Sequence, residues 1–132
     1  MREELLDQGA GACWLRSDRI ARIVEKAFLL FDGERYRLHA WTIMPNHVHL
    51  LLTVLSGRPL GGAIASWKRF TSREANRELG RSGAFWQVDY WDRFIRNDEH
   101  FEAARSYIDY NPVKAGLVKE PHSWPWGSAR FR

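Results

Sequence analysis

Apolar residues recur at helical spacing over one early segment of the chain. Ser17 and Asp18 precede this segment as a predicted N-terminal cap, and Gly33 follows it as a predicted stop. The apolar positions of one face are Ile20, Ile23, Val24, Ala27, Phe28 and Phe31. Because these positions are three and four residues apart, they predict an amphipathic helix.

Two runs rich in β-branched and aromatic residues come next. They extend from Tyr36 to Met44 and from His47 to Val54, and Pro45-Asn46 separates them. Such a short break between two runs indicates antiparallel strands joined by a tight turn. Their strong apolarity predicts that both lie in the centre of a sheet.

A second amphipathic helix is predicted to start near Pro59 and to stop at Gly80. Its inward positions are Leu60, Ile64, Trp67 and Thr71, and its largely outward basic positions are Lys68, Arg69, Arg73 and Arg77. The net charge of the chain is +4, and the six basic residues between positions 58 and 81, set against two glutamates, account for all of it. A positive face of this kind suits a polyanion such as nucleic acid, although a solvated helix face gives the same pattern.

The remaining segments complete an α+β pattern. Residues 85–95 alternate imperfectly between aromatic and polar types, which predicts a half-exposed strand with a bulge. A helix capped by Asn97 is predicted to end near Tyr110, because Asn111 precedes Pro112 and proline lacks the backbone donor. Residues 1–13 are interpreted as an irregular start and residues 119–132 as an irregular cover over the core. The prediction is one domain over residues 1–132, an antiparallel sheet flanked by helices.

Composition narrows the setting. The single cysteine, Cys13, cannot form an internal disulfide, so the fold needs no oxidising compartment. No apolar run reaches the length of a membrane span, and the start lacks the apolar stretch of a signal peptide. We therefore expect a cytoplasmic, nucleoid-associated protein without a membrane partner. The seven tryptophans are many for 132 residues and need an explanation.

Two histidines begin the second predicted strand. His47 and His49 are two residues apart, so both rings leave the same face of the strand. Two imidazoles placed in this way can share one metal ion, yet such a pair on a strand is more often structural. The His-x-His pair of a metal-dependent hydrolase barrel needs roughly 250 residues around it, which excludes that class here.

A tyrosine and an asparagine share one face of the last predicted helix. Tyr107 and Asn111 are four residues apart, about one helical turn. A tyrosine hydroxyl can act as a nucleophile, and an asparagine carbonyl can bind a hard cation such as Mg²⁺. The plainer alternatives are that Tyr107 is an ordinary core or surface ring and that Asn111 caps the turn at Pro112.

Three segments together resemble the REP-associated tyrosine transposases of the single-tyrosine HUH superfamily. They are residues 39–52 (HAWTIMPNHVHLLL), residues 85–118 with the pattern Tyr-Ile-x-Tyr-Asn-Pro-Val-Lys-x-Gly, and residues 123–129 (SWPWGSA). The similarity extends from about Trp14 to Ser128. The histidine pair alone is a weak signal, whereas its order and spacing relative to the tyrosine segment is highly specific.

The resemblance implies a ferredoxin-like HUH fold and a role for each matching residue. His47 and His49 would bind Mg²⁺ or Mn²⁺ with Asn111 as third ligand, and Tyr107 would be the nucleophile, with Tyr110 as its competitor. The implied reaction is cleavage and rejoining of single-stranded DNA through a 5′-phosphotyrosine, at repeats that fold as hairpins. Because the phosphotyrosine keeps the energy of the broken diester, a second 3′-hydroxyl can reverse the attack without ATP.

A single-stranded substrate also suggests where the DNA binds. Bases stack on exposed rings while the backbone follows a basic groove. The candidates are Trp86, Tyr90 and Trp91 for stacking, the four basic residues of the second helix for the backbone, and Lys114 for a phosphate. Most tryptophans of a small domain are nevertheless core residues.

One departure from the family pattern keeps other functions open. Family members usually have a strand before the first helix, and the irregular start predicts that this strand is missing. A truncated or domesticated DNA-hairpin binding protein without cleavage activity is therefore one alternative, and a small structural metal protein is another. Use of the tyrosine helix within a monomer or across a dimer stays undecided.

Overall fold

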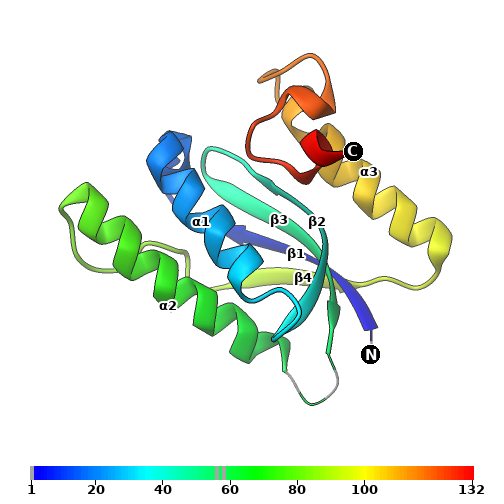
Figure 1. Cartoon of the computed structure of the whole chain (residues 1–132), viewed down its shortest axis with the longest axis horizontal. Helices are drawn as coiled ribbons and strands as arrows, with labels where there is room; N and C mark the ends of the chain where they lie inside the picture. The colour runs from blue at the N-terminus through cyan, green and yellow to red at the C-terminus, as the bar shows by residue number, and fades with distance from the viewer. Residues whose placement is uncertain (1, 56, 58) are drawn as a thin grey trace.

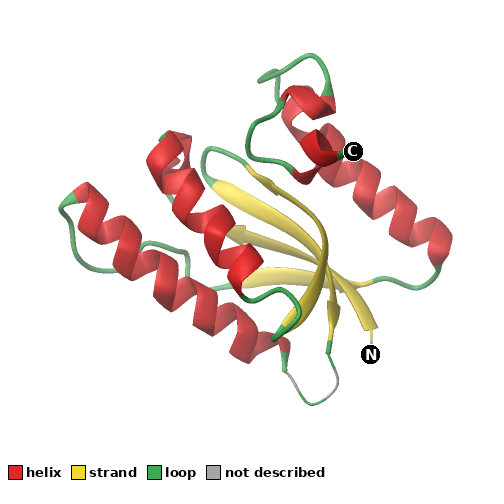
Figure 2. Ribbon diagram, viewed as in Figure 1, coloured by secondary structure: helices red, strands yellow, loops and turns green. Residues whose placement is uncertain are grey.

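The computed structural model describes residues 2–55, 57 and 59–132, and backbone only for Arg2. Arg58, one of the six basic residues counted above, lies outside the described residues. Three long helices and four strands make up most of this part of the chain (Figures 1 and 2). In chain order these are β1 (Arg2–Gly9), α1 (Asp18–Leu30), β2 (Tyr36–Ile43), β3 (His47–Val54), α2 (Leu60–Leu79), β4 (Tyr90–Phe94) and α3 (Asp98–Lys114), with short 3₁₀ turns at Cys13–Arg16, Pro121–Ser123 and Ser128–Phe131.

The strands form one antiparallel sheet in the order β2-β3-β1-β4. The predicted antiparallel α+β fold is thus confirmed, but the prediction of an irregular start and a missing first strand is wrong. Strand β1 pairs with β3 on one side and β4 on the other. Its polar residues Glu4 and Gln8 are buried beside Leu6 on one face, and this masked the two-residue alternation in the sequence. Of the two strands predicted to be central, β2 is instead an edge.

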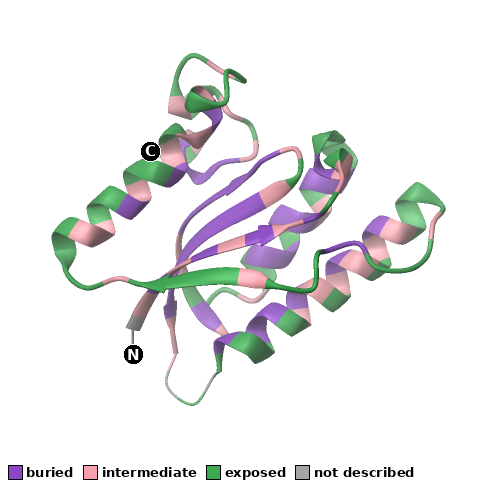
Figure 3. Ribbon diagram, turned by 180° about the vertical axis from the view of Figure 1, so that it is seen from behind, coloured by how far each residue is buried: buried purple, intermediate pink, exposed green. Residues whose placement is uncertain are grey.

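The two faces of the sheet carry separate apolar cores. On one face α1 and α2 pack together over Leu6, Val48, Leu50 and their neighbours, and α3 lies on the other face (Figure 1). The α3 core is small and consists of Ala40, Leu51, Ala104 and Ile108. Figure 3 shows α3 apart from the other two helices, with β4 exposed along the sheet edge. The α3 face is therefore only partly covered, and it is the face of His47 and His49.

The helices begin and end largely where the sequence predicts. Helix α2 ends at Leu79, and Gly80 after it adopts the left-handed conformation (φ 65°) that favours glycine. Helix α3 is capped by the side chain of Asn97 as predicted, but it continues through Pro112 to Lys114. Proline removes one helical hydrogen bond. The buried Pro112 ring packs in a crevice that Ile108, Pro121 and Trp124 also line, and this contact offsets the loss.

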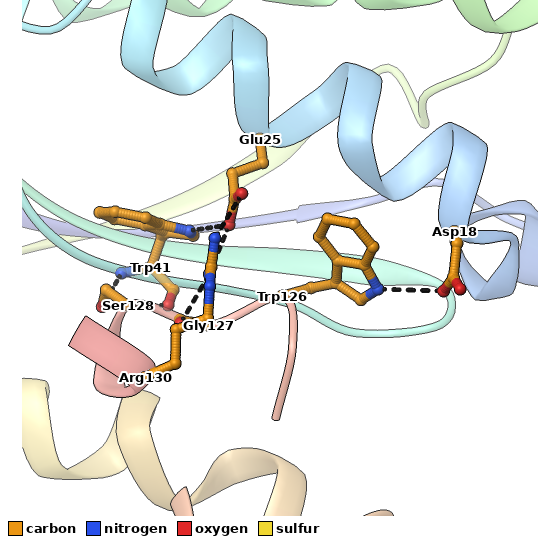
Figure 4. Close-up of polar contacts among 7 residues, drawn as sticks. All are labelled: Asp18, Glu25, Trp41, Trp126, Gly127, Ser128 and Arg130. Carbon is orange, nitrogen blue, oxygen red and sulfur yellow. Dashed lines mark hydrogen bonds and ion pairs between the residues drawn. The ribbon is translucent and has the colours of Figure 1, made fainter. Parts of the chain in front are cut away.

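The C-terminal segment covers the free edge of β2. Ile43 donates its backbone N–H to the Trp126 carbonyl at 2.9 Å, and Thr42 forms a bridge with Gly127. Figure 4 shows the ion pair that fastens the segment, in which Arg130 binds Glu25 of α1. The segment predicted to cover the core thus lies along the edge of β2. No helix of the described residues is long and apolar enough to cross a membrane.

Candidate active site

The histidine pair lies at the start of β3, directly after a turn that backbone hydrogen bonds hold in place. Ala10 donates its N–H to the Asn46 carbonyl at 2.9 Å, and Leu15 donates to the Pro45 carbonyl at 3.1 Å. The two histidine rings project from the same face of the strand, with centroids 4.7 Å apart and planes at 82°. Turn and strand thus hold both imidazoles together at the rim of the sheet.

Both imidazoles are held in the neutral state. Burial and, to a smaller extent, the nearby His47 lower the pKa of His49 to about 4. Burial also lowers the pKa of His47. The Nδ1 of His47 lies 2.7 Å from the Asn46 side-chain oxygen, which is an acceptor, so Nδ1 carries the hydrogen. The Nε2 lone pair of His47 is therefore available to a metal ion.

Tyr107 reaches the histidines from α3. Its ring meets the His49 ring edge to face, with centroids 5.3 Å apart, and the side chain is 46% exposed. The buried neighbours Ala104 and Ile108 anchor this part of α3 on the sheet. The hydroxyl-bearing ring is thus fixed beside the pair yet accessible to a large substrate.

The other two residues predicted on α3 lie nearby along the helix. Tyr110 is 54% exposed and is turned about 60° around the helix from Tyr107. Asn111 is half-buried one turn beyond Tyr107. The structure therefore brings His47, His49 and Tyr107 together, while Tyr110 is no part of the cleft described next.

An open cleft of about 440 Å³ lies between β4, β1 and α3 in front of His49 and Tyr107. Asp7 also lines it, and its carboxylate lies 3.9 Å from His49 Nδ1, longer than a hydrogen bond. Burial raises the pKa of Asp7, and His47 lowers it in part. Sequence reasoning missed this carboxylate because the segment around it was predicted to be irregular.

The side chains of the site supply part of the ligands that a divalent cation needs. Neutral imidazoles are the form that binds a metal, and His47 and His49 supply two of them. Among the described residues no group of three histidine, cysteine, aspartate or glutamate side chains is arranged to hold an ion. Further ligands must then come from an amide such as that of Asn111, from water or from a substrate phosphate.

The basic residues predicted on α2 lie on the opposite side of the sheet from this cleft. Lys68 donates to the carbonyls of Gln87 and Val88 at 3.0 and 3.3 Å, so its ammonium group fixes the segment that leads into β4. Arg73 and Arg77 both lie within 3.5 Å of Glu74. Arg69 is exposed. The α2 residues therefore cannot contact the same nucleotide as Tyr107.

The aromatic residues divide between the core and the cleft. The prediction that Trp86 stacks on DNA is wrong, because Trp86 is 5% exposed and donates its indole N–H to Thr71 at 2.7 Å. The prediction of a strand from residue 85 is also wrong, since β4 begins only at Tyr90. Trp86 belongs to a cluster of packed rings, and this cluster explains much of the tryptophan surplus; its members are Trp14, Phe28, Trp67, Phe85 and Trp86.

The two predicted stacking residues on β4 point in opposite directions. Tyr90 packs against the core beneath α2. Trp91 pairs across the sheet with Asp7, lines the cleft and is 76% exposed. Lys114 is exposed in the last turn of α3, two turns beyond Tyr107 on an unbroken helix. Trp91 is therefore the predicted stacking residue that the structure places at the cleft.

Comparison with known families matches residues 15–111 to the transposases described as IS200-like. The chain belongs to the IS200-like transposase family. The matched residues include His47, His49, Tyr107 and Asn111, whereas Leu5 and Asp7 of the cleft precede them. The resemblance inferred from the sequence motifs is thus confirmed at the level of the family.

Individual relatives of the chain are consistent with this family. A REP-associated tyrosine transposase of Escherichia coli K12 is 29% identical over 93 residues, which are 70% of this chain and 54% of that protein. A Haemophilus influenzae protein that carries the same name provisionally is 32% identical over 96 residues, 65% of this chain and 54% of that protein. The chain thus spans about half the length of these relatives.

A solved structure confirms the fold. It is that of a REP-associated tyrosine transposase bound to a REP hairpin, and it superposes with a TM-score of 0.77 at 22% identity. The match covers 98% of this chain and 78% of the other. At this identity the likeness concerns the arrangement of helices and strands.

Proposed function

We propose that the protein cleaves and rejoins single-stranded DNA at hairpin-forming repeats, with Tyr107 as the nucleophile. The observation that carries the proposal is the contact of the Tyr107 ring with His49, beside His47, at an open cleft. These residues come from two elements that are far apart in sequence. A substrate as large as a DNA strand requires an accessible site of this kind, and membership of a transposase family supports DNA as the substrate.

In the proposed reaction the Tyr107 hydroxyl oxygen attacks the scissile phosphorus. A bond forms between this oxygen and phosphorus, the bond from phosphorus to the 3′-oxygen breaks, and the proton leaves with the 3′-oxygen as a hydroxyl. The strand stays attached through its 5′-phosphate, and a second 3′-hydroxyl reverses the step. His47, His49 and Asn111 would hold Mg²⁺ or Mn²⁺, which supplies polarisation of the phosphate when bound.

The protein's own groups explain why such a site is usable near neutral pH. Free tyrosine has a pKa near 10, so Tyr107 needs a neighbour that accepts its proton or stabilises its anion. His47 and His49 stay uncharged because burial lowers the pKa of each. The same neutral state leaves their lone pairs free. Contacts of Ala104 and Ile108 with the sheet fix the position of the tyrosine before substrate arrives.

A hairpin-binding protein without cleavage activity was the main alternative. The structural argument for this alternative was that the first strand is missing, but β1 is present between β3 and β4. The site residues that binding alone does not require also lie together. We therefore propose cleavage, and binding without cleavage becomes an outcome of the test.

The test is formation of a covalent protein–DNA adduct. Purified protein is incubated with labelled single-stranded hairpins that carry single-stranded flanks, with Mg²⁺ or Mn²⁺, and the products are separated on a denaturing gel. The adduct is expected with the unchanged protein and is expected to disappear in Tyr107→Phe. Tyr110→Phe is the matched control because Tyr110 is on the same helix and similarly exposed. Hairpin binding without any adduct would overturn the proposal.

A further inference from the structure

The cleft at Tyr107 continues along the sheet edge toward the start of α3. A second hollow of about 600 Å³ adjoins it, lined by Arg93, Phe94, Arg96, Asn97 and His100. Arg93 and His100 line both hollows. Together the two form an extended channel with Tyr107 at one end and Arg96 at the other.

Strand alternation determines which β4 side chains face this channel. Trp91 pairs with Asp7 and Arg93 pairs with Leu5, so both project toward the α3 face. Asp92 between them pairs with Leu6 and projects toward the α1–α2 face. An aromatic ring and a guanidinium thus stand side by side in the channel, two residues or about 7 Å apart along the strand.

His100 contributes a hydrogen-bond donor from the opposite wall. Its Nδ1 accepts the backbone N–H of Arg96 at 3.1 Å, so in the neutral ring the hydrogen resides on Nε2. His100 precedes Tyr107 by two helical turns, roughly 10 Å along α3. The donor and Arg93 thus line the same cleft as the nucleophile.

The charges of the channel favour a phosphate at this point. No carboxylate of the described residues is paired with Arg93 or Arg96, whereas Arg105 on α3 is paired with Glu102. Asp98 and Glu99 occupy the first turn of α3, so the helix terminus itself is not the anion site. Asp7 and Asp92 also line the cleft, and neither is paired with Arg93.

We propose that this channel binds the single-stranded flank next to the scissile phosphate, with Arg93 and His100 contacting a neighbouring backbone phosphate and Trp91 stacking on a base. The inference rests on the proposed function and extends it to the path of the substrate. In this proposal the flank and the stem of the hairpin contact different faces of the sheet. The unpaired flank lies on the α3 face, and the basic helix α2 on the other face remains for the hairpin stem.

The experiment measures binding in the Tyr107→Phe background without added metal, so that no cleavage occurs. Fluorescence anisotropy compares a labelled hairpin with a single-stranded flank against the same hairpin without it. We expect Arg93→Gln to weaken binding of the flanked hairpin five- to tenfold, to reduce the salt dependence by about one phosphate contact, and to leave the bare hairpin unaffected. His100→Asn keeps an acceptor for the Arg96 N–H and is expected to weaken the flanked hairpin about threefold.

Trp91→Ala provides an independent readout. We expect at least a fivefold loss for the flanked hairpin with an unchanged salt dependence, because stacking releases no counterions. Lys119→Gln is the matched charge control, since this exposed lysine lies beyond the other end of α3. Arg93→Lys keeps the charge and should restore most of the binding. Circular dichroism and urea unfolding verify that each variant is folded.

If Arg93→Gln binds the flanked hairpin as tightly as its Tyr107→Phe parent does, the inference is overturned. It is also overturned if Arg93→Gln weakens binding of the flanked and the bare hairpin equally. Failure of the proposed function is a separate result. No adduct would form with Tyr107 intact, while the flank-dependent losses of Arg93→Gln and Trp91→Ala would persist. An adduct that forms normally in Arg93→Gln, together with unchanged flank binding, would refute the channel alone.

Discussion

Replacing Arg130 with alanine tests the ion pair that fastens the C-terminal segment to α1. The guanidinium donates to both carboxylate oxygens of Glu25 at 2.7 Å, and the Trp41 indole N–H donates to one of them at 3.0 Å (Figure 4). The Glu25 side chain is 11% exposed. In Arg130→Ala the Trp41 indole would be the one partner left to the buried carboxylate among the described residues, so the variant should be clearly destabilised.

The expected magnitude follows from burial. Removing one partner of a fully buried pair costs about 3–5 kcal/mol, because the other charge stays desolvated. The Arg130 side chain is 25% exposed, so water can partly replace it. We therefore expect a loss of about 2 kcal/mol in the free energy of unfolding, or about 7 °C in Tm. Urea unfolding followed by tryptophan fluorescence measures the change.

Arg19 offers a matched control. It forms a 2.8 Å ion pair with Glu78, but the two side chains are 78% and 37% exposed. Surface pairs of this kind contribute about 0–1 kcal/mol, so Arg19→Ala should change the unfolding free energy by about 0.5 kcal/mol or less. If Arg130→Ala and Arg19→Ala were equally mild, burial would not govern the Glu25–Arg130 pair and the reasoning would fail.

Three further predictions concern the site and its supports. The folded pKa of His49, about 4, lies below its unfolded value of 6.5, so the unfolded chain takes up this proton first as the pH falls. The free energy of unfolding without metal should fall by up to about 3 kcal/mol between pH 6.5 and 4, and a urea titration of His49→Gln should lack this slope. Trp86→Ala should lower the free energy of unfolding by about 3–5 kcal/mol because the ring is buried, whereas Trp91→Ala should lower it by less than about 0.5 kcal/mol. Equal losses in urea unfolding would contradict the assignment of Trp86 to the core and Trp91 to the cleft. Lys68→Met removes two hydrogen bonds to the Gln87 and Val88 carbonyls, so it should lower the free energy of unfolding by about 1 kcal/mol. It should also speed proteolysis between residues 81 and 89, with Arg69→Met as control. Unchanged proteolysis would show that Lys68 does not hold this segment.

Elements with clean periodicity were predictable from the sequence. Helix α1 and helix α2 follow from apolar spacing and from glycines beyond their ends, and the strands β2 and β3 follow from their β-branched runs. Strand β1 was missed because its buried face carries Glu4 and Gln8, so burial and polarity disagree there. The end of α3 was missed because packing of the Pro112 ring outweighs its backbone cost.

The site was predictable only as far as motifs reach. His47, His49 and Tyr107 were singled out from spacing and resemblance, and the structure places the three together. Asp7, Arg93 and His100 carry no motif, and only the pairing of β1 with β4 and the position of α3 bring them to the cleft. The sequence does not distinguish the buried Trp86 from the exposed Trp91, because the burial of each ring depends on where β4 begins.

The central position of β1 has a consequence for how the polypeptide assembles during synthesis. The hairpin of β2 and β3 is local and can form as soon as it leaves the ribosome, whereas β1, made first, must wait for β3 and then for β4. Non-local pairing of this kind slows folding and leaves strand edges open for longer. The nascent chain therefore has an interval in which the Asp7–His49 pairing is made but Trp91 has not yet been added, so the floor of the cleft forms before its outer wall.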